Sequence, residues 1–210
     1  MSVLSVEKVG GVSLIVGSLL LTVYSALFTV LLPLNGGQYD FVQVVLNPNW
    51  VRLATIALAG VLLMLVGFYA VYLSVQASAG VLGAIGFLFV EAAYLLQACK
   101  VTWELFLYPI IASHPDSAFL LGNAIIRNDP AVQAFRLLAS LTILIGIILF
   151  CFTLYRSKEY PKAGAVLIFA GALVYAIGPM VSIYVAVAGI FAFSIGCLLI
   201  GLRLIKVSNK

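Results

Sequence analysis

Long apolar stretches, separated by short polar connections, run through the whole sequence. A helix needs about 20 predominantly apolar residues to cross the hydrocarbon core of a bilayer. By that rule the pattern predicts six membrane-spanning helices within a single transmembrane domain that covers residues 1–210. The expected spans are residues 9–32, 51–75, 79–108, 132–155, 163–177 and 180–205.

The prolines agree with these boundaries, because all seven lie at or outside the ends of the predicted spans. A proline there does no harm, since the first helical N–H groups have no partner within the helix. The first span is expected to stop at Pro33, and Gly178-Pro179 separates the fifth span from the sixth. If Pro179 only kinks one helix, the number of spans falls to five and the C-terminus moves to the other side of the membrane.

The connections differ in length between the two sides of the predicted bundle. Short turns at residues 76–80 and 156–162 lie on one side, and longer connections at 33–50 and 109–131 lie on the other. Within the last of these, Asp116 or Ser117 is expected to cap a short helix, because both residue types accept hydrogen bonds from free N–H groups.

Composition places the chain among integral membrane proteins. Hydrophobic residues make up 64% of it and charged residues 9%, and the mean hydropathy is +1.22. Soluble domains carry about 25% charged residues, so this chain lacks the polar material to cover a surface in water. The expected fold is therefore all-α: a polytopic, six-helix bundle in the cell membrane. The first apolar run exceeds the roughly 7–15 residues of a signal peptide, which indicates a retained span.

The net charge of +4 reports orientation rather than a nucleic-acid partner, because the basic residues gather at span ends. Cytoplasmic ends of spans carry the excess of Lys and Arg. With the N-terminus inside, these ends hold Lys8, Arg156, Lys158, Lys162, Arg203, Lys206 and Lys210. The opposite side holds Arg52, Arg127 and Arg136. Both termini are predicted to be cytoplasmic, with short cytoplasmic turns and two longer outer loops.

Glycines recur at seven-residue spacing within several spans. The series are Gly10 and Gly17; Gly60 and Gly67; Gly164, Gly171 and Gly178; and Gly189 and Gly196. A seven-residue step returns to nearly the same helix face, and small residues let helix backbones approach closely in lipid. We expect these faces to pack within a tight bundle.

The third span differs from the others because it carries Glu91, Gln97, Lys100 and Glu104. Burying an ionisable group in hydrocarbon is costly, so such residues are candidates for function. Gln97, Lys100 and Glu104 share one helix face. Glu91 lies nine residues from Lys100, on the opposite face, and roughly 18 Å along the helix from Ala79, near the midplane of the membrane.

Each of these residues allows two interpretations. Glu91 is either a proton- or ligand-binding carboxyl, or a neutral acid that is hydrogen-bonded to a tyrosine and holds the bundle in register. Tyr24 and Tyr175 lie at comparable depth and are the expected partners. Lys100 and Glu104 form either a local ion pair at the lipid headgroups or a pair that faces a ligand.

Three further residues on the outer side complete the candidate site. Trp103 lies near the outer boundary, where a belt of aromatic residues is typical. His114 lies in the 109–131 connection, and Arg136 opens the fourth span. The sequence implies no metal and no cofactor: it has one histidine, and its three aspartates stand apart in loops. No set of residues recommends an enzyme.

Four short motifs resemble a family of uncharacterised bacterial six-helix membrane proteins. They are KVGGVSLIVGSLLL in the first span, NPNWVRLA at the start of the second, the run from Trp103 to Pro109, and GPMV from Gly178 to Val181. The resemblance covers nearly the whole chain. It implies six helices and no activity, and it draws attention to Glu104 and Pro109.

The leading hypothesis is binding or translocation of a small, partly apolar ligand through an outward-facing pocket beside the third helix. Gln97, Lys100 and Glu104 would orient its polar end, and Glu91 would be a buried proton-linked group. The alternative is a non-catalytic subunit or assembly factor of a larger membrane complex, or a homo-oligomer. Membrane lipids are the expected partners in every case.

Overall fold

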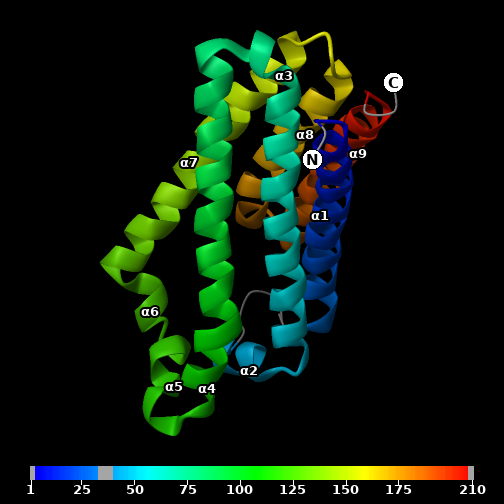
Figure 1. Cartoon of the computed structure of the whole chain (residues 1–210). Coiled ribbons are helices and arrows are strands. Elements are labelled where there is room, and N and C mark those ends of the chain that lie inside the picture. The colour runs from blue at the N-terminus through cyan, green and yellow to red at the C-terminus, as the bar shows by residue number, and fades with distance from the viewer. Residues whose placement is uncertain (1–2, 33–39, 208–210) are drawn as a thin grey trace.

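The computed structural model describes residues 3–32 and 40–207, and over these ranges the chain is helical, without strands. The longer helices form a bundle that is joined at one end by short helices (Figure 1). In chain order the elements are α1 (Val3–Leu31), α2 (Phe41–Leu46), α3 (Asn49–Thr102), the π-helical turn η1 (Trp103–Leu107), α4 (Tyr108–Ser113), α5 (Pro115–Gly122), α6 (Ile125–Asn128), α7 (Pro130–Arg156), α8 (Lys162–Ile177), the 3-10 turn η2 (Gly178–Met180) and α9 (Ile183–Val207).

The start of α1 and the end of α9 lie at the same end of the bundle, which we call the terminal end (Figure 1). Helices α2, α4 and α5 lie at the opposite end, which we call the far end. Helix α1 packs between α3 and α9, and α7 packs between α3 and α8. Towards the far end α7 leans away from the bundle (Figure 1), and Leu137, Leu138 and Leu141 on this part of it are exposed.

Helix α3 folds back on itself at Gly80. This residue has φ 60° and ψ −168°, a conformation that is open essentially only to glycine. The two arms then run antiparallel, since the Tyr72 and Phe87 rings stack at 4.2 Å and the Phe68 and Tyr94 centroids lie 5.5 Å apart. The chain thus reverses within the turn expected at 76–80, but Gly80 alone leaves the helical conformation there, so the turn is tighter than the five residues predicted.

Helices α8 and α9 form a second antiparallel pair. The helical path ends in η2 at Gly178–Met180, and α9 starts again at Ile183. The chain reverses here because Gly171 faces Phe193 while Gly178, seven residues later, faces Ala186 earlier in α9. The interpretation of Pro179 as a break between two helices is thus confirmed, and the kinked single helix is wrong.

The glycine faces pack against one another, as their spacing predicts. A Cβ built on Gly17 would lie 3.0 Å from the carbonyl oxygen of Gly60, and one on Gly67 would lie 2.8 Å from the Cα atom of Leu14. Such distances leave no room for a side chain, so α1 and the first arm of α3 touch backbone to backbone. The glycines of α8 and α9 meet in the same way.

One polar contact joins the first long helix to the last. The hydroxyl oxygens of Thr22 in α1 and Ser194 in α9 lie 2.6 Å apart. Ser194 donates to the carbonyl oxygen of Ser18 at 2.8 Å, and Thr22 donates to the same carbonyl at 3.0 Å. All three side chains are buried, where a satisfied hydrogen bond fixes the register of two helices.

The connections at the far end are more helical than the sequence suggests. Asp40 caps α2 through a 2.9 Å bond from the N–H of Val42, within a stretch expected to be a loop. Helix α5 is preceded by His114, so neither Asp116 nor Ser117 caps it. Pro33, the expected end of the first span, lies outside the described residues, and α1 ends at Leu31.

Four helical stretches of the described chain are long and apolar enough to cross a membrane. They are Val6–Leu31, Asn49–Ser113, Pro130–Arg156 and Ile183–Lys206, and Lys162–Ile177 is a shorter apolar helix. Apolar side chains cover much of the outside of these helices, among them Leu19, Leu62, Leu88, Ile148 and Leu202. The chain is therefore built for insertion into a membrane.

Candidate functional site

The second arm of α3 brings its charged residues to the far end of the bundle. Lys100 and Glu104 lie one helical turn apart, and Nζ of Lys100 is 3.4 Å from Oε1 of Glu104. The Lys100 side chain is 41% accessible and that of Glu104 is 16% accessible. The predicted pair thus forms within a single helix, with its acidic member largely covered.

A change of helical register positions Glu104. Pro109 has no N–H to donate to the carbonyl four residues earlier, and just before it the N–H of Tyr108 bonds the carbonyl of Trp103, five residues back. This π-helical turn covers Trp103–Leu107, and such turns occur frequently at functional sites. The indole Nε1 of Trp50 donates a 2.7 Å bond to the Glu104 carbonyl oxygen, which ties the turn to the first arm of α3.

Other helices contribute polar side chains around the pair. Tyr24 of α1 and Tyr108 lie close enough to Glu104 for its charge to act on their hydroxyl groups. Tyr175 of α8 and Arg136 of α7 lie close enough to Lys100 to act on its charge. Segments from four parts of the sequence therefore lie near one charged pair.

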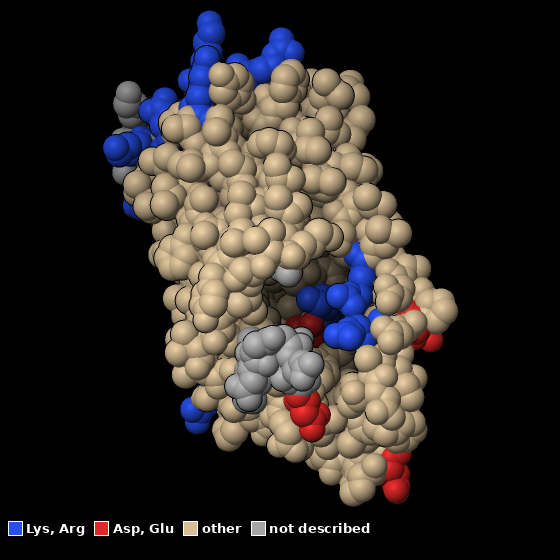
Figure 2. All heavy atoms as spheres, turned by 180° about the vertical axis from the view of Figure 1, so that it is seen from behind, with Lys and Arg blue, Asp and Glu red and all other residues tan. Residues whose placement is uncertain are grey.

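The surface of the molecule is hollowed toward the far end. Figure 2 shows a hollow in the half of the molecule toward the far end, with Lys and Arg side chains gathered on its wall and an acidic side chain deep inside. Lys100 has protein around it on most sides, yet a large part of its side chain stays accessible. That combination is expected of a residue that lines a hollow, and not of one on a convex surface.

Glu91 lies apart from this cluster. Its Oε1 atom is buried and has no hydrogen-bond partner among the described residues, although a buried polar atom without a partner is costly. Tyr24 and Tyr175, its expected partners, lie instead in the surroundings of Lys100 and Glu104. Tyr94, three residues on in the same helix, lies near Glu91.

The remaining candidates divide between the cluster and the outer surface. Gln97 is half-buried one turn before Lys100. Trp103 packs on Phe135 of α7, with ring centroids 5.1 Å apart. His114 is exposed at the end of α4, and its Nδ1 atom lies 2.8 Å from the Ile110 carbonyl oxygen. His114 therefore takes part in the local turn and not in the cluster.

Sequence reasoning missed three residues of the site. Tyr94 and Tyr108 stand three and four residues after Glu91 and Glu104, a spacing that places side chains on one helix face, so both signals were present. Trp50 gave no such signal, because its bond to the Glu104 carbonyl spans 54 positions. Among the described residues, no three His, Cys, Asp or Glu side chains come close enough to hold a metal ion.

The arrangement suits recognition of a polar group by charge. Lys100 pairs with Glu104, and Arg136 is a second cation close enough to affect Lys100, so an anionic group would find excess positive charge here. Comparison of the chain with family models, with curated proteins and with solved structures gives no match. The resemblance drawn from the short motifs accordingly stays a prediction.

Proposed function

We propose that the protein crosses the membrane six times and binds a small, partly apolar ligand in the hollow beside the second arm of α3. The six crossings are α1, the two arms of α3, α7, α8 with η2, and α9. Each arm of α3 is long enough, since roughly 20 residues suffice. Helix α8 has 16 residues, about 24 Å, and η2 extends it.

The charge distribution supports an orientation with both ends of the described chain in the cytoplasm. Basic side chains gather at the terminal end (Figure 2). Those at the ends of the described helices there are Lys8, Arg156, Lys158, Lys162, Arg203 and Lys206. Arg52, Arg127 and Arg136 belong to helices that begin or lie at the far end. The positive-inside rule therefore places the hollow on the outer side.

The observation that carries the binding proposal is a charged pair in an otherwise apolar bundle, together with a hollow with basic side chains on its wall in the same half of the molecule. Lys100 and Glu104 are joined at 3.4 Å, with Arg136 nearby. Because this region holds two cations and one carboxylate, the polar end of the ligand is anionic. Its remaining part is apolar, because apolar side chains make up most of the bundle. Ionisable side chains within an otherwise apolar bundle favour such a function over a merely structural one.

Glu91 has a separate role in the proposal. Its buried oxygen has no partner among the described residues, so the carboxyl is free to exchange a proton without breaking a hydrogen bond. A proton on Glu91 would accompany ligand movement if the protein is a transporter. The charged pair would bind the ligand in either case.

The alternative of a non-catalytic subunit receives less support. The glycine faces contact helices of the same chain, so they are not free to pack on a partner chain. The apolar surface that remains is what lipid tails cover in any membrane protein. Purification in mild detergent distinguishes the two, because a stoichiometric partner chain would favour the subunit.

Thermal unfolding in detergent tests the binding proposal. Octanoate should raise the midpoint temperature, whereas octanol, which has the same tail and no charge, should not. Lys100→Gln should weaken the octanoate effect by about ten-fold or more in concentration, since a bond to a charged group contributes about 1.5–3 kcal/mol. Arg52→Gln removes a cation near the same end and should leave the effect unchanged. Equal effects of octanol and octanoate, or of the two variants, would contradict the proposal.

A further inference from the structure

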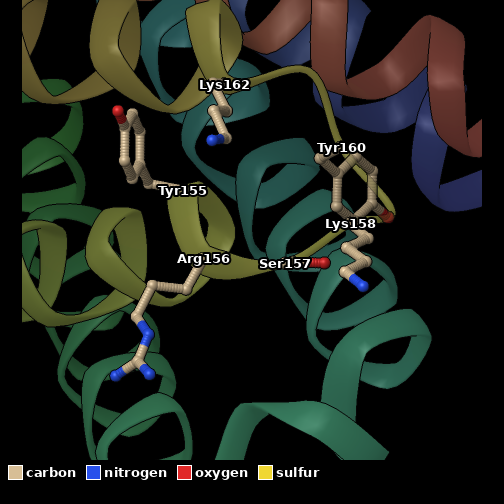
Figure 3. A pocket seen from close by; sticks show the side chains of 6 residues that line it. All are labelled: Tyr155, Arg156, Ser157, Lys158, Tyr160 and Lys162. Atoms are coloured by element: carbon tan, nitrogen blue, oxygen red, sulfur yellow. The ribbon is translucent and has the colours of Figure 1, made fainter.

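A pocket at the terminal end lies where α7 turns into α8. Its volume is about 470 Å³, and the residues that line it are Tyr155, Arg156, Ser157, Lys158, Tyr160 and Lys162. Figure 3 shows Tyr155 and Lys162 on one side of the pocket and Lys158 and Tyr160 on the other. This pocket is separate from the hollow seen in Figure 2, which lies toward the far end.

The lining is strongly basic and its charges are not neutralised. Three of the six residues are cations and none is acidic. Arg156, Lys158 and Lys162 form no ion pair with any carboxylate in the described part of the chain. Glu159 belongs to the same turn but does not line the pocket, and its carbonyl oxygen accepts a 2.9 Å bond from Nε of Arg203. The pocket therefore attracts anions.

Aromatic rings hold two of the cations at the boundary between apolar and polar surface. Nζ of Lys162 lies 5.2 Å from the centroid of the Tyr155 ring. The guanidinium carbon of Arg156 lies 5.5 Å from the centroid of the Phe152 ring. A cation above a ring face is attracted to it, and the N–H groups that point away from the ring stay free for a ligand.

Below the cations, each helix carries an exposed apolar stripe. On α7 it consists of Ile145, Ile148 and Phe152, which precede Arg156 by eleven, eight and four residues. On α8 it consists of Val166, Phe169 and Leu173, which follow Lys162 by four, seven and eleven residues. These spacings keep each stripe on the same helix face as its cation.

The length of the stripes fits one leaflet of a bilayer. Eleven residues of helix rise roughly 16 Å, and half of a hydrocarbon core measures about 15 Å. A free anion would contact only the cations. A phospholipid contacts both the cations and the stripes, because its charged headgroup and its acyl chains follow one another over this distance.

We infer that the pocket at the α7–α8 turn is a binding site for the phosphate-bearing headgroup of an anionic phospholipid, whose acyl chains lie along the exposed stripes of α7 and α8. Arg156 presents the two parallel N–H groups that suit phosphate oxygens, and Lys158 and Lys162 add charge. The hydroxyl of Ser157 is a further donor. The site concerns the leaflet at the terminal end and is independent of the ligand proposed for the hollow.

Native mass spectrometry of the full chain in a mild detergent tests this inference. Phosphatidylglycerol should bind in preference to phosphatidylcholine with the same acyl chains. In the double variant Arg156→Gln, Lys162→Gln its affinity should fall roughly 25-fold, because each cation near an anionic lipid contributes about 1 kcal/mol. The double variant Lys8→Gln, Lys206→Gln removes the same charge from the same end but outside the pocket, and should bind as the wild type does.

Two further measurements serve as controls. One tests whether the site takes a soluble phosphate instead of a lipid, and the other tests whether the glutamine variants damage the fold. Glycerol phosphate at the same concentration should neither bind nor displace the lipid; if it competes on equal terms, the site takes a soluble phosphate and the lipid assignment is overturned. The variant Arg156→Lys, Lys162→Arg keeps the charge and should keep most of the affinity. Equal losses in the two glutamine variants, or no preference for phosphatidylglycerol, would also overturn the inference.

Discussion

The indole Nε1 of Trp50 donates a 2.7 Å hydrogen bond to the backbone carbonyl oxygen of Glu104. The bond joins the start of one arm of α3 to the π-helical turn at the end of the other, so the two arms cannot slide past each other without breaking it. The turn that carries Glu104 therefore depends on a residue 54 positions earlier in the chain.

We expect Trp50→Phe to lower the free energy of unfolding by about 1–2 kcal/mol, because the carbonyl loses its partner while an aromatic ring remains. The ring would keep its neighbours Phe41 and Phe28, whose centroids lie 5.8 and 6.3 Å away. Thermal unfolding in detergent measures the loss. Trp103→Phe is the matched control: its ring packs on Phe135 at 5.1 Å, and it should cost less. Equal losses would show that the Trp50 bond contributes little.

Gly80 should tolerate no side chain, although space is available. A Cβ on Gly80 would meet nothing within 4 Å, so the cost of Gly80→Ala comes from its backbone conformation alone. Residues forced into that conformation lose about 1–3 kcal/mol. Gly122→Ala is the control, because a Cβ there meets only Val42 at an ordinary 3.4 Å. A midpoint temperature unchanged by Gly80→Ala would mean that the turn between the arms adapts.

Glu91→Leu should raise the stability of the protein. The buried Oε1 atom has no partner among the described residues, and removing such an atom recovers about 1–3 kcal/mol. A rise in the midpoint temperature, together with loss of any ligand-driven proton uptake, would show that Glu91 lowers stability and serves function. If Glu91→Leu instead destabilises the fold while Glu91→Gln does not, the carboxyl serves as a hydrogen-bonding link within the bundle.

Tyr160 should make stability depend on pH in the alkaline range. Burial raises the pKa of this phenol from 10.0 to about 12, so the folded protein holds the proton more tightly than the unfolded chain does. Its contribution is complete below about pH 10 and is lost as the pH rises to about 12. Over this window the wild type should lose roughly 2–3 kcal/mol more than Tyr160→Phe.

The wild type and Tyr160→Phe are compared by how steeply the stability of each falls with pH. Tyr160 also hydrogen-bonds the Ser74 hydroxyl, and its loss lowers the stability of the variant at every pH. Unfolding midpoints measured at pH 8, 10 and 12 separate the constant loss from the pH-dependent one. Parallel curves for wild type and variant would contradict the pKa shift.

Local sequence patterns were sufficient to predict features that depend on the residues of a single helix, such as its packing face or its end. The seven-residue spacing of Gly10 and Gly17 predicts a helix face that allows close approach. The spacing of Gly60 and Gly67 predicts the face that packs against it. Gly178 and Pro179 likewise mark the reversal between α8 and α9. Helix α2 escaped notice because its apolar residues were assigned to a loop, although Asp40 was in place to cap it.

The site was predictable only in part. Glu91, Lys100 and Glu104 stand out because charges are rare in the spans, and the Lys100–Glu104 pair follows from a spacing of four residues. Which residues surround the pair depends on how α1, α7 and α8 pack against α3. Helix spacing cannot report that, and so Tyr24 and Tyr175 were assigned to Glu91 while they lie near Lys100 and Glu104.

The contact between Thr22 and Ser194 carries a consequence for biosynthesis. Chains are made from the N-terminus, at about 5–20 residues per second, so α1 exists for many seconds before α9 leaves the ribosome. During that interval Thr22 and Ser18 lack the partner that Ser194 supplies at 2.6 and 2.8 Å. The bundle closes only when its last helix arrives, and a chain that stops before Ile183 leaves one side of α1 open to lipid and to the quality-control proteases of the membrane.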